Sequence, residues 1–266
     1  MPYLDIHSHI YPEKISVKAT NTVCDFYDVT TVHHGSAGEL LEVDKKAGIY
    51  RTVILPVSVN PVHTESINNF TLREAAEHKE FIPFATMHAD NEDMEELTSH
   101  FFEQGFFGVK LHPDMQKFNV DDERLFPMYD MMGDKLLLMV HAGDPRYDYS
   151  HPRRIKRILH EFPHLRVIAA HFGGWSMQET AFPILKDEER CYTDTSSALS
   201  HMTPEVAMKY INGYGVERVM FGSDYPIEDP VENVRLINAL PLGEDDFERV
   251  THGNAENLLN SVHKSD

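Results

Sequence analysis

The chain has few cysteines and no apolar run of membrane length. Its 266 residues include only two cysteines, Cys24 and Cys191. Two cysteines are too few for the disulfide framework of a small secreted domain, so we expect an intracellular, cytoplasmic protein. A bilayer span needs about 20 consecutive apolar residues, and none of the apolar runs approaches that length. The first residues also lack the basic segment and apolar run of a signal peptide.

Positive charge is scarce as well. Lys and Arg together number 24 against 43 Asp and Glu, which gives a formal net charge of −19. Because proteins bind the nucleic-acid backbone chiefly through Lys and Arg, this balance argues against a nucleic-acid partner. We therefore expect a soluble protein whose partner is a small-molecule substrate.

Short apolar segments alternate with helical patterns along the whole chain. The segments lack the apolar–polar alternation of a strand with one solvated face, so we predict strands covered on both faces, as in a parallel sheet. The eight predicted strands cover residues 3–10, 52–57, 81–87, 107–113, 135–141, 166–171, 191–195 and 218–222. The predicted helices cover residues 36–47, 65–79, 91–104, 124–132, 152–161, 176–187 and 204–214.

This alternation predicts an α/β fold built from βαβ units. Successive strand ends are about 31 residues apart, which suits one such unit. Eight units close into a (β/α)8 TIM barrel, so we predict one barrel domain over residues 1–266. A doubly wound open sheet is the alternative, but no glycine-rich dinucleotide fingerprint follows the first strand. We expect residues 10–36 to form an irregular segment over the active-site rim.

The first predicted strand ends in a His-x-His pair. His7 and His9 are two positions apart, so both side chains project from the same face of the strand. Two imidazoles placed in this way can bind one divalent metal such as zinc. A chance pair is the alternative, because the chain contains 17 His.

Other polar residues stand at the ends of the predicted strands. Lys110 and His112 end the fourth strand, His141 the fifth and His171 the sixth, and Asp224 follows the eighth. In a barrel of parallel strands these ends meet at one rim, where the active sites of such barrels lie. The sequence therefore predicts that these residues and the His-x-His pair share one site.

Five motifs, taken in order, resemble the amidohydrolase superfamily. They are Asp5-Ile6-His7-Ser8-His9, Lys110-Leu111-His112-Pro113, Val140-His141-Ala142-Gly143, Ala170-His171-Phe172-Gly173-Gly174 and Phe221-Gly222-Ser223-Asp224-Tyr225-Pro226. They are most similar to the amidohydrolase-related branch, which includes aminocarboxymuconate-semialdehyde decarboxylase, resorcylate decarboxylases and some lactonases. Residues 254–259 also match the C-terminal helix of that branch, so the resemblance covers nearly the whole chain.

The resemblance implies a ligand set and two catalytic residues. His7, His9, His141 and Asp224 would bind one divalent metal, most often zinc. His171 would lie beside the water that the metal activates and help to position it. Asp224 is acidic and near the metal, so it can also carry a proton. Dimers are common in this branch, which leaves a homodimer as one expectation for the assembly.

Four further residues are candidates for substrate binding. Lys110 would bind a substrate carboxylate or form a structural ion pair; in binuclear relatives the equivalent lysine is carboxylated and bridges two metals. His112 lies near the site. Arg146 follows the fifth strand and can grip a carboxylate with two hydrogen bonds, or lie on the surface. Trp175, the only tryptophan, either walls the pocket or packs beside it.

Three functions stay open at this point. We place first a metal-dependent hydrolase that acts on an amide, lactone or similar bond of a small carboxylate-bearing molecule. The alternative is a lyase, a non-oxidative decarboxylase of an aromatic or unsaturated carboxylic acid. The third is a non-catalytic barrel, against which the nearly complete ligand set argues. A phosphoesterase of the related TatD-like DNase group does not fit, because its strand-four Glu is missing here.

Overall fold

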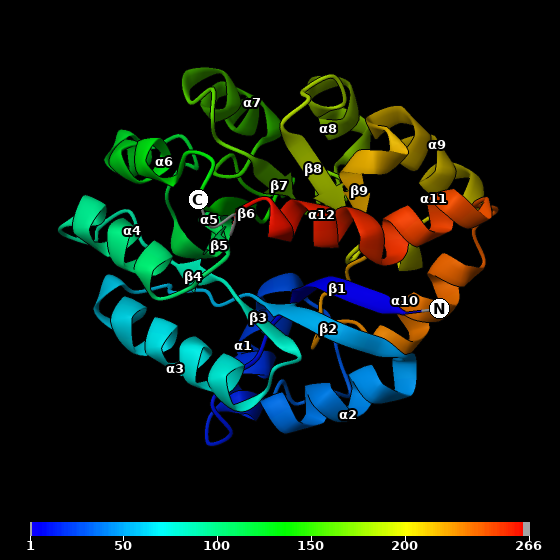
Figure 1. Ribbon diagram of the computed structural model, residues 1–266, viewed down its shortest axis with the longest axis horizontal. Coiled ribbons are helices and arrows are strands. Elements are labelled where there is room, and N and C mark those ends of the chain that lie inside the picture. Colours follow the sequence, from blue (N-terminus) through cyan, green and yellow to red (C-terminus); the bar gives the residue numbers. More distant parts are fainter. Residues whose placement is uncertain (1, 263–266) are drawn as a thin grey trace.

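The computed structural model describes residues 2–262 and shows a barrel of parallel strands enclosed by helices (Figure 1). Every neighbouring pair of strands is parallel. The strands are β1 (Tyr3–Ser8), β2 (Ile49–Ile54), β3 (Phe81–Pro83), β4 (Ala85–Thr86), β5 (Gly108–Leu111), β6 (Leu137–Val140), β7 (Val167–Ala169), β8 (Cys191–Asp194) and β9 (Val219–Met220). The predicted α/β barrel is confirmed.

The third predicted strand is divided into β3 and β4. β3 pairs with β2, whereas β4 pairs with β5. Between them the backbone N–H of Phe84 donates to Ile54 O at 3.2 Å, and Phe107 N–H donates to Pro83 O at 3.0 Å. The divided strand thus bonds to both neighbours, and it joins the two halves of the sheet into one barrel.

The barrel closes where β1 meets the segment after β9. Asp224 N–H donates to His7 O at 2.8 Å, and His9 N–H donates to Tyr225 O at 2.7 Å. Because both strands run in the same direction, their C-terminal ends lie together at one rim. Closure therefore brings the His-x-His pair next to the aspartate that follows the last strand.

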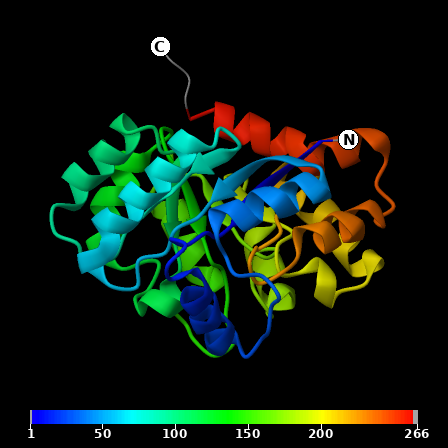
Figure 2. The ribbon, with the colours of Figure 1, turned by 90° about the horizontal axis from the view of Figure 1, so that it is seen from below.

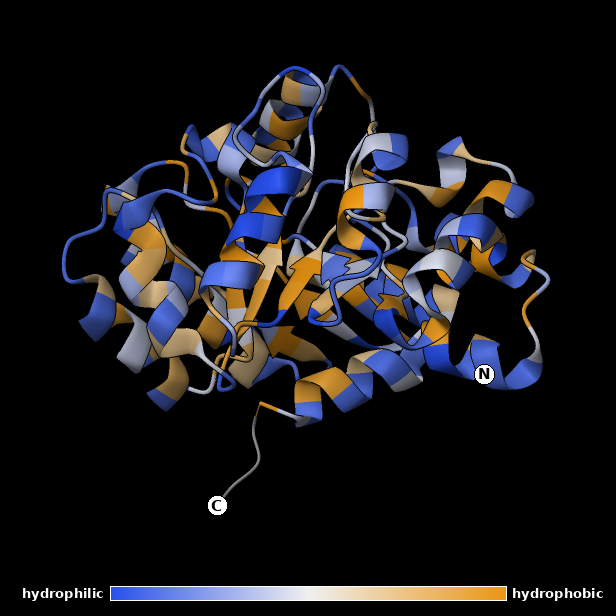
Figure 3. Cartoon of the chain, turned by 90° about the horizontal axis from the view of Figure 1, so that it is seen from above, coloured by the Kyte–Doolittle hydropathy of each residue, from blue (hydrophilic) through white to orange (hydrophobic). Residues whose placement is uncertain are grey.

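The helices lie outside the strands, and their polar residues face outward while the central strands are apolar (Figure 3). They are α1 (Ser16–Tyr27), α2 (Ala37–Ala47), α3 (Thr64–Glu77), α4 (Met94–Glu103), α5 (Pro113–Gln116), α6 (Phe126–Met132), α7 (Pro152–Glu161), α8 (Gln178–Leu185), α9 (Pro204–Tyr214), α10 (Pro230–Asn238), α11 (Glu244–Glu248) and α12 (Asn254–Asn260). Among residues 2–262, no helix is both long enough and apolar enough to span a membrane.

Local capping explains where individual helices begin and end. Ser36 Oγ accepts a hydrogen bond from Glu39 N–H at the start of α2, and Gly48 ends that helix with a φ of 79°. The helix predicted over residues 91–104 begins later than expected. α4 begins after Asp93, because the Asn91 side chain instead accepts from His88 N–H at 2.8 Å.

The prediction of an irregular segment over residues 10–36 was wrong in its middle, where α1 (Ser16–Tyr27) forms. Ile15, Ala19 and Val23 follow one another at intervals of four, and such residues lie on one face of a helix. Figure 2 shows α1 at one end of the barrel and α12 at the opposite end. The helix thus covers the rim at which the strands end.

The barrel interior is filled by apolar side chains and sealed at its N-terminal end by α12. The buried strand residues of this cluster are Leu4, Ile6, Val53, Leu55, Ile82, Phe84, Leu137, Met139, Ile168, Ala170 and Met220. α12 adds Ala255, Leu258 and Leu259 to the same cluster. Because this end is closed by apolar packing, access to the barrel is from the α1 end.

We predict that Leu258→Ala destabilises the fold, because the Leu258 side chain is 4% exposed and its removal leaves a cavity under the strands. The free energy of unfolding, measured by denaturant titration, is expected to fall by about 2–5 kcal/mol. Val62→Ala is the control, since Val62 is 80% exposed and surface truncations usually change stability by less than about 0.5 kcal/mol. Equal effects of the two substitutions would contradict the proposed seal.

Candidate metal centre

Three side-chain donors converge at the rim where the barrel closes. The Nε2 atoms of His7 and His9 lie 3.2 Å apart. Asp224 Oδ1 lies 3.4 Å from His7 Nε2 and 3.5 Å from His9 Nε2. Tetrahedral ligands held about 2.0–2.1 Å from one zinc ion lie about 3.3–3.4 Å from one another. The spacing and chemistry of these donors therefore fit one divalent ion.

Hydrogen bonds on the far side of each ring orient the two imidazoles. His7 Nδ1 lies 3.0 Å from Asp194 Oδ2, and His9 Nδ1 lies 2.6 Å from Leu55 O. Since a carboxylate and a carbonyl only accept, both Nδ1 atoms carry the proton and both Nε2 lone pairs face the common point. Burial and the nearby Lys110 lower the pKa of His7 to about 3. The ring is thus neutral, which is the form that binds a metal.

A buried carboxylate fixes the ends of the two strands that carry the donors. Asp5 Oδ1 accepts from the backbone N–H of His7 at 2.9 Å and of Ser223 at 3.0 Å. Asp5 Oδ2 accepts from the hydroxyls of Ser8 at 2.8 Å and Ser223 at 2.5 Å. Burial raises the pKa of Asp5 to about 6 despite these hydrogen bonds. One side chain therefore couples β1 to the loop that positions Asp224.

The backbone at the site is strained or tightly packed. Asp224 and His171 have φ angles of 66° and 62°, in the left-handed region that residues other than glycine rarely adopt. Gly222 packs so closely that a Cβ there would lie 3.1 Å from the Cβ of His7 and 3.4 Å from that of Asp194. A side chain at position 222 would therefore press on both the metal ligand and its orienting carboxylate.

His141 lies beside the three donors but not within their group. Its ring stacks on His112 with centroids 4.1 Å apart, and its Nδ1 is 3.1 Å from His171 Nε2. Among the described residues, the donor groups that contain His7 are His7–His9–Asp224 and His7–His171–Asp194. The role of His141 as a further metal ligand stays a prediction.

Tyr27 is a site residue that we did not predict from the sequence. It reaches the centre from the last turn of α1, and its Oη lies 2.6 Å from His112 Nε2 and 3.2 Å from His141 Nε2. His112 Nδ1 accepts from Met115 N–H, so His112 Nε2 donates to Tyr27, whose hydroxyl can donate to His141. Ile15, Ala19, Val23 and Tyr27 are spaced four residues apart, and this spacing was the sequence signal that could have identified the helix face.

Lys110 is wholly buried next to the metal donors. Its Nζ lies 3.1 Å from His7 Nε2, and burial lowers its pKa to about 8. The structure shows no ion pair between Lys110 and any carboxylate of residues 2–262, so the structural ion pair that we considered is not formed. The amine instead lines the cavity beside the donors.

Arg146 uses three of the five N–H donors of its guanidinium within the protein. Its guanidinium binds both oxygens of Asp144, at 2.9 and 2.7 Å, and donates to Phe26 O at 2.5 Å. It also stacks on the ring of Phe26, 4.6 Å from the centroid. Arg146 therefore anchors the end of α1 and lies outside the cavity lining. The predicted grip on a substrate carboxylate stays a prediction, which this placement does not favour.

Trp175 does not wall the cavity either. Its ring packs against Tyr27 with centroids 4.7 Å apart and is 6.4 Å from His141. The cavity lining includes Tyr27 and His141 but not Trp175. The tryptophan therefore supports the residues that face the cavity, which is the packing role that we had considered as its alternative.

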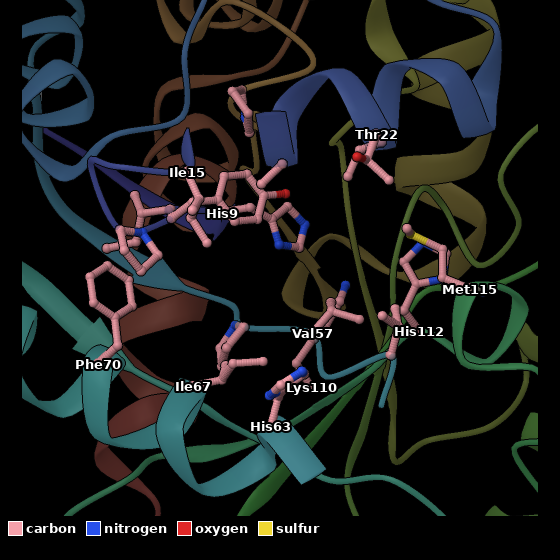
Figure 4. A pocket seen from close by; sticks show the side chains of 18 of the residues that line it. His9, Ile15, Thr22, Val57, His63, Ile67, Phe70, Lys110, His112 and Met115 are labelled. Carbon is pink, nitrogen blue, oxygen red and sulfur yellow. The ribbon is translucent and has the colours of Figure 1, made fainter. Parts of the chain in front are cut away.

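The donors lie in a cavity of about 590 Å³ at the rim of the barrel (Figure 4). Its inner end holds His9, Lys110 and His112, which Figure 4 shows pointing into the same space. The other walls are largely apolar and come from α1, α3, α5 and the loops after β1 and β2. These residues include Ile10, Ile15, Ala19, Val23, Val57, Ile67, Phe70 and Met115. The site thus combines a polar floor with apolar walls.

Solved structures of other proteins share this fold over their full length. An uncharacterised TIM-barrel protein from Bordetella bronchiseptica is 19% identical with a TM-score of 0.81, and the alignment covers 99% of this chain and 100% of that chain. 5-Carboxyvanillate decarboxylase from Sphingomonas paucimobilis is 15% identical with a TM-score of 0.76, covering 97% and 99%. A dihydroxybenzoic acid decarboxylase from Polaromonas with bound manganese is 14% identical with a TM-score of 0.73, covering 97% of each chain. None of the curated proteins matches the sequence.

Residues 30–260 match the sequence profile of the amidohydrolase family, so the chain belongs to that family. This membership confirms the resemblance that the motifs indicated and makes the protein a metal-dependent enzyme. The third candidate function, a non-catalytic barrel, is thereby ruled out.

We predict that the double substitution His7→Ala and His9→Ala abolishes metal binding, since it removes two of the three converging donors. Elemental analysis after metal loading is expected to find less than about a tenth of the wild-type metal. Circular dichroism is expected to be unchanged. His201→Ala is the control, because His201 is exposed and does not line the cavity. Retention of one ion per chain by the double variant would refute the site.

We also predict one divalent ion per wild-type chain, since the three donors surround a single point. Elemental analysis against protein concentration measures this ratio. Two ions per chain, with one lost in Lys110→Ala, would instead identify Lys110 as a carboxylated bridging ligand.

Proposed function

We propose that this protein is a metal-dependent non-oxidative decarboxylase of an aromatic or unsaturated carboxylic acid. The observation that carries the proposal is the placing of His7, His9 and Asp224 at the floor of a largely apolar cavity. Apolar walls suit a flat hydrocarbon ring, and the polar floor suits a carboxylate. We had placed hydrolysis first from the sequence. The apolar cavity and the decarboxylases among the structural relatives favour the alternative.

The cavity assigns different roles to the residues at its inner end. Lys110 Nζ can donate to the substrate carboxylate, and His112 and Tyr27 form the wall against which a ring can stack. A divalent ion bound by the three donors would polarise the substrate's oxygen atoms and offset their negative charge. We propose a divalent ion but do not assign the metal, since the resemblance implied zinc and the Polaromonas enzyme binds manganese.

Decarboxylation needs one proton to be delivered to carbon. The bond between the ring carbon and the carboxylate breaks, its electron pair stays on the ring carbon, carbon dioxide leaves, and the carbon takes up a proton. Asp224 lines the cavity, whereas His171 lies behind His141 and does not. We therefore propose that Asp224 carries the proton. Because its carboxylate is ionised, it first takes up a proton from the solvent or the substrate and then delivers that proton to the carbon. His171 is a positioning residue, whose ring lies 5.1 Å from that of His7.

A hydrogen bond from Ser197 holds the Asp224 carboxylate, since the Ser197 hydroxyl donates to Asp224 Oδ2. Oδ1 of the same carboxylate faces the two histidines. Burial opposes ionisation of Asp224, but the neighbouring His7 and His9 shift its pKa well below the usual range. The carboxylate is thus held in one orientation, with one oxygen toward the metal donors.

We predict that Asp224→Asn lowers carbon dioxide release from aromatic carboxylates by at least about 100-fold, because it removes the proton carrier. The assay compares manganese-loaded wild type and variant on a panel of hydroxybenzoates, with metal content measured in parallel. Asp229→Asn is the matched control, since the Asp229 side chain is 45% exposed and does not line the cavity.

The same panel includes lactones and amides, whose opening is followed separately. Carbon dioxide release from at least one aromatic or unsaturated acid supports the proposal. Hydrolysis of lactones or amides without any release of carbon dioxide would overturn it in favour of the hydrolase.

A further inference from the structure

The cavity is longer than its metal end requires. A volume of about 590 Å³ lies in the range of roughly 300–1,000 Å³ that buries ligands of drug size, which exceeds a single-ring acid. From the metal donors it continues between α1 and α3, where Figure 4 shows Ile15 facing Ile67 and Phe70. We call this part the α1–α3 channel, and its residues are Ile15, Ala19, Val23, Ile67, Phe70 and Arg73.

One face of each helix is directed into the channel. On α3 the lining residues Ser66, Ile67, Phe70 and Arg73 follow the helical repeat. On α1 the lining residues continue the same pattern, and the adjacent face, with Ser16, Thr20 and Cys24, is buried against the protein. Ordinarily such an apolar stripe is covered by the core. Here it borders empty space, and Ile15 is 50% exposed.

Arg73 supplies a positive charge at the far end of the channel. Seven positions separate it from Ser66, which corresponds to about 10 Å along the helix axis. Within residues 2–262, the charged side chains lining the cavity are Lys110 and Asp224 at the metal end and Arg73 on α3. Arg73 is exposed where it lines the cavity, and among residues 2–262 its guanidinium forms no hydrogen bond or ion pair.

An unpaired guanidinium at a cavity wall is suited to bind an anion. Guanidinium groups bind carboxylates with two parallel hydrogen bonds. Glu74 interacts electrostatically with Arg73, but neither Glu74 nor Glu77 forms an ion pair with it. Arg73 is therefore available to an anionic ligand at the end of an apolar path.

We propose that the substrate is an elongated acid with two anionic ends. The carboxylate that is removed lies at the metal donors, an apolar stretch occupies the α1–α3 channel, and a second anionic group pairs with Arg73. This inference rests on the proposed function for the first carboxylate. The channel and Arg73 concern binding alone, so they are testable without turnover.

Three related probes separate the parts of this proposal. Benzoate carries the head group alone, para-butylbenzoate adds an apolar chain, and para-(carboxypropyl)benzoate adds a terminal carboxylate to that chain. Dissociation constants are measured by calorimetry with manganese-loaded protein. Affinity is expected to rise at least about 10-fold from the first probe to the second. A further rise of about 5- to 10-fold is expected for the third, the diacid.

Two variants assign these gains to the channel. Arg73→Gln is expected to remove the extra affinity of the diacid while leaving the binding of para-butylbenzoate unchanged. Arg235→Gln is its matched control, since Arg235 is an exposed helical arginine that pairs with Glu232. Ala19→Phe fills the channel and is expected to weaken para-butylbenzoate binding while benzoate binding stays the same.

The outcomes separate this inference from the proposed decarboxylation. Equal affinity of benzoate and para-butylbenzoate would overturn the channel, and an unchanged diacid affinity in Arg73→Gln would overturn the second anionic group. Neither result depends on whether carbon dioxide is released. Conversely, a graded affinity series without carbon dioxide release from any acid keeps the inference on binding and contradicts only the proposed reaction.

Discussion

The buried carboxylate of Asp5 joins the two chain segments on which the site depends. It accepts hydrogen bonds from the backbone of β1 and from the loop after β9, at positions His7 and Ser223. His7 is itself a metal donor and Ser223 directly precedes Asp224, so a single side chain sets the distance between the His-x-His pair and Asp224. Closure of a barrel by hydrogen bonds between its first and last strands is general. Here the donors lie on the seam where the barrel closes. The same hydrogen bonds therefore stabilise the barrel and set the geometry of the site.

The sequence predicted those parts of the structure that follow from strand direction. Continuous apolar strands separated by helices predict a parallel barrel, and in such a barrel every strand end lies at one rim. His7, His9 and Asp224 could therefore be placed together although about 215 positions separate the last two. α1 was missed because its four-residue repeat is short and lies among polar residues. Trp175 was predicted either to wall the pocket or to pack beside it, and in the structure it packs against Tyr27.

The partner of Arg146 could not be predicted from the sequence. Arg146 follows a strand end, as a substrate-binding residue often does, but Asp144 two positions earlier takes both sides of its guanidinium. Sequence spacing does not say which of two nearby acids or ligands an arginine will bind. Tyr27 shows the converse case. Its hydroxyl reaches His112 and His141 only because Arg146 and Trp175 hold the end of α1 against the rim.

A polar floor beneath apolar walls connects these features to chemistry. The floor holds donors whose orientation is set by Asp194 and Leu55. In the proposed reaction, the apolar walls would limit the access of water to the carbon that is protonated. The central claim is that His7, His9 and Asp224 bind one divalent ion. Anomalous diffraction from crystals loaded with manganese tests it most directly. We predict one anomalous peak within about 2.0–2.3 Å of both Nε2 atoms and of Asp224 Oδ1. A peak elsewhere, or none at these three atoms, would contradict the account.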